Sequence, residues 1–471
     1  MFGWVVIQSG VAAAQENPLP LMKSQEDEIV DGDHIEWAEI PILNLGTTVK
    51  IAMMGNPGLE AAIARVRQAQ AQVDQARSTY WPRLDASASG ARVELSQNAY
   101  EQNLAAARIV DPNIALKNPD EYYLADLTAS WILFNGFERK FTNVAAKYGE
   151  QSRAAALNDT RRLLISSVAL AYYSAQLASK NVAIAEANEA FNQRQLKDAK
   201  ARQRVGTGPL ADVLNFQIRM NDAKTERINQ EYRYQIALYG LAALMGLPES
   251  RFPDHVKLAE LGPETDAELA NPSVQELVKL AMDFRPDIQE AKWRIKQSEA
   301  LIKVAQSEYY PSIVVSGSLN GERTGDPPDG IDHYANSIRL GLTYNLFEGG
   351  RTRAKVRENR QRVVELEKLL ENLILSATAD IRSSAALVVT AQSQVALQGE
   401  NMKLAERNRG LIEKEYNAGQ VSLVRLNEAQ RDVIAAQSNL ALARVALRQA
   451  WVELETRTGN ILANYNMTAT N

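Results

Sequence analysis

The stretch EYNAGQVSLVRLNEA, from Glu415 to Ala429, interrupts two very long helical patterns and decides how the rest of the chain is interpreted. A matching stretch, QRVGTGPLADVLNFQ, breaks a similar pattern from Gln203 to Gln217. The two align at an offset of 213 positions, which places Gly206 on Gly419. Glycine supplies the left-handed backbone that ends a helix, so both stretches predict hairpin tips. We therefore expect a duplicated chain that turns twice at one end of a long molecule.

The helical patterns that flank these tips are too long for a compact domain. Residues 138–204 contain no proline, and at 1.5 Å per residue this run would reach roughly 100 Å. A second run extends from Arg351 to the tip at Gly419. An apolar repeat of seven keeps a seam against neighbouring helices. In the first run it consists of Leu163, Leu170, Leu177, Ile184 and Phe191.

Four shorter segments alternate apolar and polar residues with a period of two, as strands with one apolar face do. In one of them Ala125, Leu127 and Ala129 alternate with Asp126 and Thr128. Such segments, flanked by aromatic residues, are typical of transmembrane barrel strands, although a hairpin packed on a soluble core has the same pattern. We expect the strands at about 83–96, 122–134, 312–322 and 334–347.

The order helix, strand, strand, long helix, tip and return helix occurs twice. Val49–Pro82 and Val278–Pro311, which begin the two halves, are identical at 13 of 34 positions. An apolar run that ends in small residues near the amino terminus is typical of a secretory signal peptide. The predicted division is a signal peptide remnant at 1–14, an irregular periplasmic lead-in at 15–48, a first repeat at 49–246, a linker at 247–273, a second repeat at 274–459 and a tail at 460–471.

Composition argues against several classes of protein. The net charge is −5 and no basic patch or interleaved aromatic residues appear, so nucleic acid is not expected as a partner. Cysteine is absent, which removes disulfides and thiolate metal sites. No set of paired carboxylates, nucleophile with histidine, or phosphate-binding loop indicates an enzyme, and no cofactor or metal is expected. No uninterrupted run of 18 apolar residues occurs, so any membrane span is expected to consist of strands.

Four strands per chain cannot close a barrel, and lipid does not tolerate an open sheet edge. From about Val49 to Gly459 the sequence resembles the TolC-like outer-membrane efflux proteins. The resemblance rests on the two glycine tips, on the start at Asn56–Leu59, on the helix-to-strand junctions Tyr80–Pro82 and Tyr309–Pro311, and on the strand-to-helix junction Leu346–Arg351.

The resemblance implies a fold and a function. The fold is a mixed α and β membrane protein: a homotrimer whose twelve strands close an outer-membrane barrel that is continued by a long periplasmic helical barrel. The implied function is passive export of small molecules or polypeptides through the bacterial outer membrane. The implied partners are outer-membrane lipid, a periplasmic adaptor (membrane fusion) protein, and an inner-membrane efflux pump or ABC transporter. The alternative is a periplasmic coiled-coil scaffold or adaptor, which would leave the four strands unexplained.

The resemblance also implies roles for the tips. A family tyrosine and a family aspartate of the periplasmic gate fall on Tyr416 and Asp212. Two constricting aspartates of the family fall on Arg425 and Glu428, and the family's linking arginine falls on Val421. We hypothesise that Arg425 replaces that arginine and pairs with Asp212 or Glu428, the alternative being a solvated helix surface. The expected adaptor-docking residues are Val205, Gly206, Thr207, Gly208, Leu210, Ala418, Gly419, Val421, Ser422 and Leu423.

Aromatic residues gather at the predicted helix–strand junctions. Such side chains suit the boundary between membrane and water, because one end is apolar and the other polar. Packing of the junction in a soluble fold is the alternative. The residues are Trp81, Trp131, Phe134, Tyr309, Tyr310 and Phe347.

Overall fold

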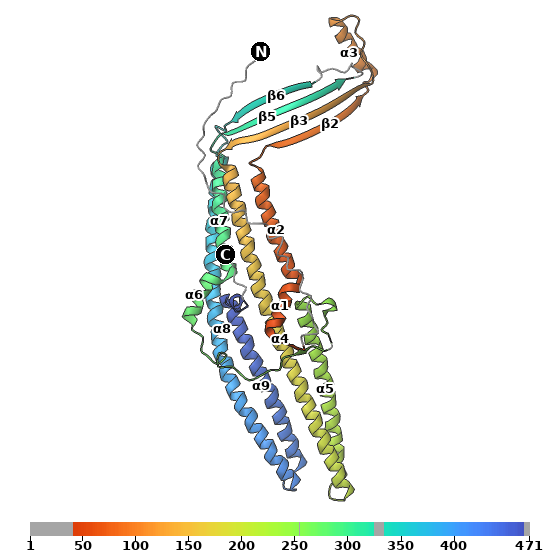
Figure 1. The fold of residues 1–471 in the computed structure, drawn as a ribbon, viewed down its shortest axis with the longest axis vertical. Helices are drawn as coiled ribbons and strands as arrows, with labels where there is room; N and C mark the ends of the chain where they lie inside the picture. Colours follow the sequence, from red (N-terminus) through yellow and green to blue (C-terminus); the bar gives the residue numbers. More distant parts are fainter. Residues whose placement is uncertain (1–40, 254, 325–333, 466–471) are drawn as a thin grey trace.

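The computed structural model describes residues 41–253, 255–324 and 334–465. The chain is elongated, with long helices that run down from one end of a sheet (Figure 1). The predicted signal peptide remnant at 1–14, most of the lead-in and the end of the tail lie outside the described residues.

Each half contributes helices and two strands of the large sheet. The first half contains α1 (Leu45–Gly55), α2 (Pro57–Ser78), β2 (Arg83–Val93), α3 (Gln97–Val110), β3 (Asp120–Asn135), α4 (Glu138–Arg204) and α5 (Leu210–Leu244). The second contains α6 (Val274–Phe284), α7 (Pro286–Ser307), β5 (Ser312–Thr324), β6 (Tyr334–Thr343), α8 (Arg351–Asn417), α9 (Leu423–Thr458) and α10 (Ile461–Asn464). A 3-10 turn at Pro248–Ser250 and the short strands β1 (Ile42–Leu43) and β4 (Lys257–Leu258) complete the described elements.

The four long strands form one antiparallel sheet in the order β2-β3-β5-β6. Ala86 pairs with Leu127, and Trp131 pairs with Val315, so the strands of the two halves lie side by side. A register shift between Ile132 and Phe134 marks the end of β3 nearest the helices. Both β2 and β6 are edge strands, so within one chain the sheet is open on both sides.

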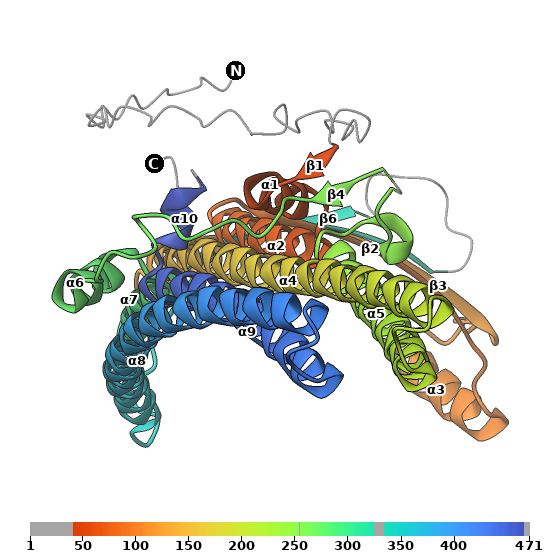
Figure 2. The ribbon, with the colours of Figure 1, turned by 90° about the horizontal axis from the view of Figure 1, so that it is seen from below.

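Below the sheet the helices form one curved layer (Figure 2). In the upper part α2 packs on α4, α4 on α7 and α7 on α8. In the lower part the order is α5, α4, α9 and α8, because α4 contacts both α5 and α9 and α9 contacts α8. The helices at the two margins of the lower layer are therefore α5 and α8.

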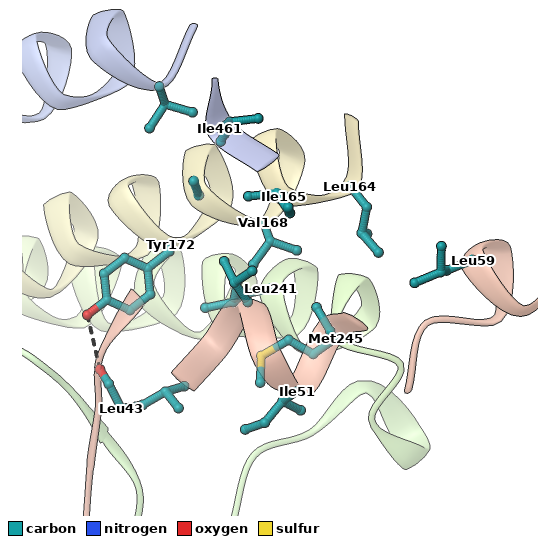
Figure 3. Close-up of a cluster of buried hydrophobic side chains, with 14 of the residues drawn as sticks. Leu43, Ile51, Leu59, Leu164, Ile165, Val168, Tyr172, Leu241, Met245 and Ile461 are labelled. Atoms are coloured by element: carbon teal, nitrogen blue, oxygen red, sulfur yellow. Dashed lines mark hydrogen bonds between the residues drawn. The ribbon is translucent and has the colours of Figure 1, made fainter. Parts of the chain in front are cut away.

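The main hydrophobic core lies where the upper and lower parts meet. Figure 3 shows Ile51 of α1, Val168 of α4, and Leu241 and Met245 at the end of α5 gathered in one cluster. The buried Tyr172 hydroxyl donates to the backbone oxygen of Leu43 at 3.0 Å, which holds the chain segment before α1 against α4. This core fixes the direction in which the lower hairpins leave the upper bundle.

Several predicted boundaries are wrong. The lead-in was expected to be irregular through residue 48, but α1 begins at Leu45, because the Asn44 side chain caps it by accepting from the Thr47 amide at 2.8 Å. The expected helix from Val49 to about Tyr80 is two helices, divided where Asn56 caps α2 and Pro57 begins it. β2 and β6 end at Val93 and Thr343, short of the expected residues 96 and 347.

Other departures concern segments expected to be irregular. The loop between the first two strands contains α3, whose residues are not buried. The linker contains β4, which pairs in parallel with β1. The tail contains α10, whose Ile461 and Leu462 join the main core.

By length and composition, one helix of the described chain, α8, meets the criterion for a membrane-spanning helix. The criterion averages hydropathy over a window, so it includes helices whose apolar run is interrupted, and for a single helix it is weak evidence of a span. A long helix packed along partners meets the same criterion, and α8 packs against α7 and α9.

Candidate functional site at the helical tips

Both hairpin tips have the same backbone structure. Gly206 and Gly419 adopt φ of 78° and 76°, in the left-handed region. The next amide donates back across the last helical turn, from Thr207 to the oxygen of Arg202 and from Gln420 to the oxygen of Glu415, both at 2.9 Å. This is the Schellman pattern that satisfies the free carbonyl groups at a helix end. The glycines therefore have a structural reason at both tips, whatever else the tips do.

A small hydrophobic core, which we call the tip cluster, joins the two hairpins. It includes side chains from α4, α5, α8 and α9, so neither tip is an independent loop. Its centre contains Phe216 and Leu426, which are 1% and 0% exposed. The buried members are Phe191, Leu196, Ala199, Phe216, Ile412, Tyr416, Leu426 and Ala429.

Tyr416 and Asp212 meet at the edge of the tip cluster. The Tyr416 hydroxyl donates to Asp212 Oδ2 at 3.3 Å, which links the last turn of α8 to the first turn of α5. Burial and the adjacent Asp212 carboxylate both raise the pKa of Tyr416 above its ordinary value. The tyrosine therefore stays a neutral donor throughout the physiological range. The family resemblance predicts both residues at the gate, and the structure brings them together.

Arg202 is a further member of this site that the sequence did not reveal. Its guanidinium lies over the Tyr416 ring, 5.2 Å from the ring centre, and its Nη2 donates to Asn417 Oδ1 at 2.6 Å. A cation over an aromatic face is attracted by the ring quadrupole. The last turn of α4 is basic, with Arg202 and Arg204, but that pattern also suits a helix carboxyl end and so could not single Arg202 out.

Arg425 and Glu428 are positioned differently from Tyr416 and Asp212. Both side chains are exposed on the first turns of α9. Among the residues that the structure describes, Arg425 makes no ion pair, either with Asp212 or with Glu428. Within one chain the hypothesis that Arg425 pairs with either carboxylate is wrong, because Asp212 is held by Tyr416 and Arg425 points into solvent.

The predicted docking residues divide into two groups. Val205 and Leu210 of the first tip are 73% and 57% exposed. Val421 and Leu423 of the second tip instead pack partly against the tip cluster. The first tip therefore offers the larger free apolar surface. The remaining predicted residues of the two tips, Gly206, Thr207, Gly208, Ala418, Gly419 and Ser422, belong mainly to the turns.

The junction aromatics lie where helices meet the sheet. Phe134 packs edge-to-face with Phe137 at 5.3 Å, and Phe137 with Tyr310 at 6.3 Å. The Trp131 indole donates to the Tyr80 backbone oxygen at 3.0 Å. The other predicted members, Trp81, Tyr309 and Phe347, are exposed. Phe137 was not predicted. It adopts a left-handed φ of 70°, which sequence alone does not indicate for phenylalanine.

Known proteins share this architecture. A model of the family described as "Outer membrane efflux protein" matches residues 49–247 and 277–460. The chain belongs to this family. It is similar to the pyoverdine export outer membrane protein OpmQ of Pseudomonas aeruginosa, at 25% identity over 90% of this chain and 86% of that protein. It is also similar to the multidrug resistance outer membrane protein MdtQ of Escherichia coli O157:H7, at 25% identity over 90% of this chain and 87% of that protein.

Similarity extends to solved structures. The CmeC outer membrane channel of Campylobacter jejuni superposes with a TM-score of 0.71 at 18% identity, over 92% of each chain. The family resemblance drawn from the sequence is thus confirmed, and so is the mixed α and β fold of outer-membrane channels. The protein is an outer-membrane efflux protein whose long helices extend into the periplasm. The alternative of a periplasmic scaffold or adaptor is wrong, because the family matched is one of outer-membrane proteins.

Proposed function

We propose that three copies of the chain close into one passive export duct. The observation that carries this proposal is the four-stranded sheet with two open edges, β2 and β6, on helices of 67 residues. In lipid an open edge leaves backbone groups without partners, each at a cost of several kcal/mol, so β2 must pair with β6 of a second copy. Three copies give a barrel of twelve strands, in the size range of outer-membrane barrels.

The margins of the helical layer support the same closure. Leu397, Leu404 and Leu411 recur at intervals of seven on α8 and are all more than half exposed. On α5, Leu214 and Ile218 are exposed in the same way. Apolar seams of this kind on opposite margins suit packing of α8 against α5 of the next copy.

The length of the helices determines what the duct can reach. A helix of 67 residues spans about 100 Å, so the tips lie far from the sheet on the periplasmic side. We propose that a periplasmic adaptor docks on the tips, chiefly on exposed Val205 and Leu210, and couples the duct to an inner-membrane pump or ABC transporter. The bond between Tyr416 and Asp212, supported by Arg202, would hold the tips in the closed arrangement. Arg425 and Glu428 would contribute charged rings to the constriction.

One relative is named for pyoverdine export and another for multidrug resistance. We propose that the cargo here is likewise a small molecule.

We also propose that the chain consists of two structural repeats, at 49–246 and 274–459, and that each repeat forms one of the two tips.

An export assay in a host that lacks its own channel tests the function. Cells with the full chain and a matching adaptor and pump should keep intracellular dye low, and cells with the empty vector should not. Val205→Asp with Leu210→Asp should abolish efflux while leaving outer-membrane trimers intact. The same double change at Ile109 and Val110 of α3, which are exposed and far from both the tips and the proposed subunit seam, is the control for loss of apolar surface. Efflux that survives the tip change would refute docking at the first tip.

A further inference from the structure

The first turns of α8 carry a dense cluster of positive charge. Residues 351–362 hold six arginine or lysine residues and a single acidic residue, Glu358. α8 follows β6 after a connection, residues 344–350, that contains the exposed Leu346 and Phe347. The overall charge of −5 averages this cluster away, so the expectation that no basic patch appears is wrong for this segment.

Only two of the six cations have a carboxylate partner. Arg351 pairs with Glu348 at 2.7 Å, and Lys355 pairs with Glu308. The Thr352 hydroxyl lies within hydrogen-bond distance of both glutamates, at 3.2 Å from Glu308 and 3.1 Å from Glu348, and can donate to one of them at a time. The other four side chains are exposed and make no hydrogen bond or ion pair with any part of the chain that the structure describes. They are Arg353, Arg357, Arg360 and Arg362.

The stability of α8 does not account for these residues. The amino end of a helix is the positive end of its dipole, so Arg353 in the first turn is unfavourable, while Arg357 and Arg360 lie beyond the turn in which the dipole acts. The equivalent helix of the first half, α4, begins with Glu138 followed by Arg139 and Lys140, so its first turn contains the acidic residue that α8 lacks. Arg353, Arg357 and Arg360 are spaced by four and three residues, which places them on one face of the helix. We call these three residues the arginine stripe. Its unpaired charge would attract an anionic partner outside the chain.

The position of the stripe relative to the sheet indicates which partner. At 1.5 Å per residue the three arginines lie about 3, 9 and 14 Å from the start of α8. Long side chains on a helix lean toward its amino end, which here is the end joined to β6. Charges within a Debye length of about 8 Å of a membrane surface are attracted to anionic lipid. The stripe is also continuous with the exposed apolar connection that follows the sheet.

We propose that the arginine stripe binds the headgroups of anionic phospholipids in the periplasmic leaflet of the outer membrane. This inference rests on the proposed function, in which the sheet lies in that membrane. The stripe then fixes the depth of the barrel, since the guanidinium groups stay at the headgroups while Leu346 and Phe347 enter the apolar layer.

Lipid selectivity of the full-length trimer tests the proposal. The trimer is reconstituted in phosphatidylcholine vesicles, and the immobilised fractions of spin-labelled phosphatidylglycerol and phosphatidylcholine are compared. The wild type should prefer phosphatidylglycerol several-fold at low salt and lose most of this preference at about 1 M salt. Changing Arg353, Arg357 and Arg360 to Gln should reduce the preference to near unity.

A control on the same helix removes an equal charge far from the bilayer. Arg382, Lys403 and Arg407 are exposed on α8, and the nearest of them lies more than about 40 Å below the helix start. Their change to Gln should leave lipid preference unchanged. Equal lipid preference in the stripe variant and the wild type would overturn the proposal. So would a change in the ion selectivity of the channel without a change in lipid preference, because the stripe would then face the lumen. Two further assays report on the proposed function separately: the heat-dependent dissociation of the trimer on gels, and the conductance of the channel in the same vesicles.

Discussion

The bond from Tyr416 to Asp212 gives the sharpest prediction, because one atom can be removed without disturbing the tip cluster. Tyr416→Phe deletes only the donor, and the ring keeps its place beneath Arg202. A hydrogen bond to a charged acceptor contributes about 1.5–3 kcal/mol, but 3.3 Å is long for an O–H donor, so we take about 1 kcal/mol. Three copies that open together would lose about 3 kcal/mol, a change of roughly 150-fold in the ratio of open to closed channels.

Single-channel recording in planar bilayers measures that ratio. Tyr416→Phe trimers should show a strongly raised open fraction, and tips that open independently should show about a fivefold change per tip. Tyr232→Phe removes an exposed hydroxyl from α5 and is the matched control. The open fraction of the wild type should also rise in alkali. Because the pKa of Tyr416 is raised, the bond is fully present below the ordinary value near 10 and is lost as pH passes the raised value. We call the bond between Tyr416 and Asp212 the tyrosine latch. A Tyr416→Phe channel that stays as closed as the wild type would refute its role in closing the duct.

Three further predictions concern assembly. Arg285→Ala should destabilise the trimer by about 1.5–3 kcal/mol, seen as a lower temperature of dissociation on gels, because the half-buried Asp287 carboxylate loses its bonds from Arg285 and keeps only the one from the Ile288 amide. Although burial opposes its ionisation, the hydrogen bond from Arg285 lowers the pKa of Asp287, so this stabilisation is present above the ordinary value and is lost as pH falls through the lowered one. Gly246→Ala should prevent trimer assembly, since a Cβ would lie 1.9 Å from a backbone oxygen, whereas Gly240→Ala in open space should not. Phe216→Ala should cost about 3–5 kcal/mol in the tip cluster and expose both tips to protease.

The long helices were predictable from the sequence because their pattern is local and repeats many times. The bounds of α4, Glu138–Arg204, are those expected from the long proline-free helical run that ends at the first glycine tip. The strands were predictable for the same reason, within a few residues. Three of the missed elements are small or exposed: α3 has no buried residue, and β1 and β4 are two residues each. The fourth, α10, buries Ile461 and Leu462, but its four residues are too few to show a helical period. The spacing of apolar residues reveals a helix only when one of its faces is buried, so it cannot indicate a helix such as α3, which has no buried face.

The site shows the same limit. Tyr416 and Asp212 were found through resemblance to a family, and the chain pattern alone would not have joined them. Arg202 was missed because its contact with Tyr416 depends on how two hairpins pack, and the residues are 214 positions apart in the sequence. Such a contact is a property of the tip cluster and is not visible in the local sequence.

The internal duplication suggests a role for Arg425 other than the expected ion pair with Asp212 or Glu428. At the offset of 213 positions, Arg425 of the second half takes the place of Asp212, and Glu415 takes the place of Arg202. Within the chain, α4 meets the second half through α7 and α9, and in the proposed trimer α8 meets the next copy in the equivalent way. The junction between copies then has Glu415 and Arg425 where the junction within the chain has Arg202 and Asp212, with the signs of charge reversed. Tyr416 is replaced there by Gln203, which cannot supply the same phenolic donor. The tyrosine latch therefore joins the two hairpins of one chain, while the junctions between chains depend on exposed charges that separate more easily. On this geometry full opening requires both kinds of junction to part, and the bond within each chain contributes the larger share of the closing free energy.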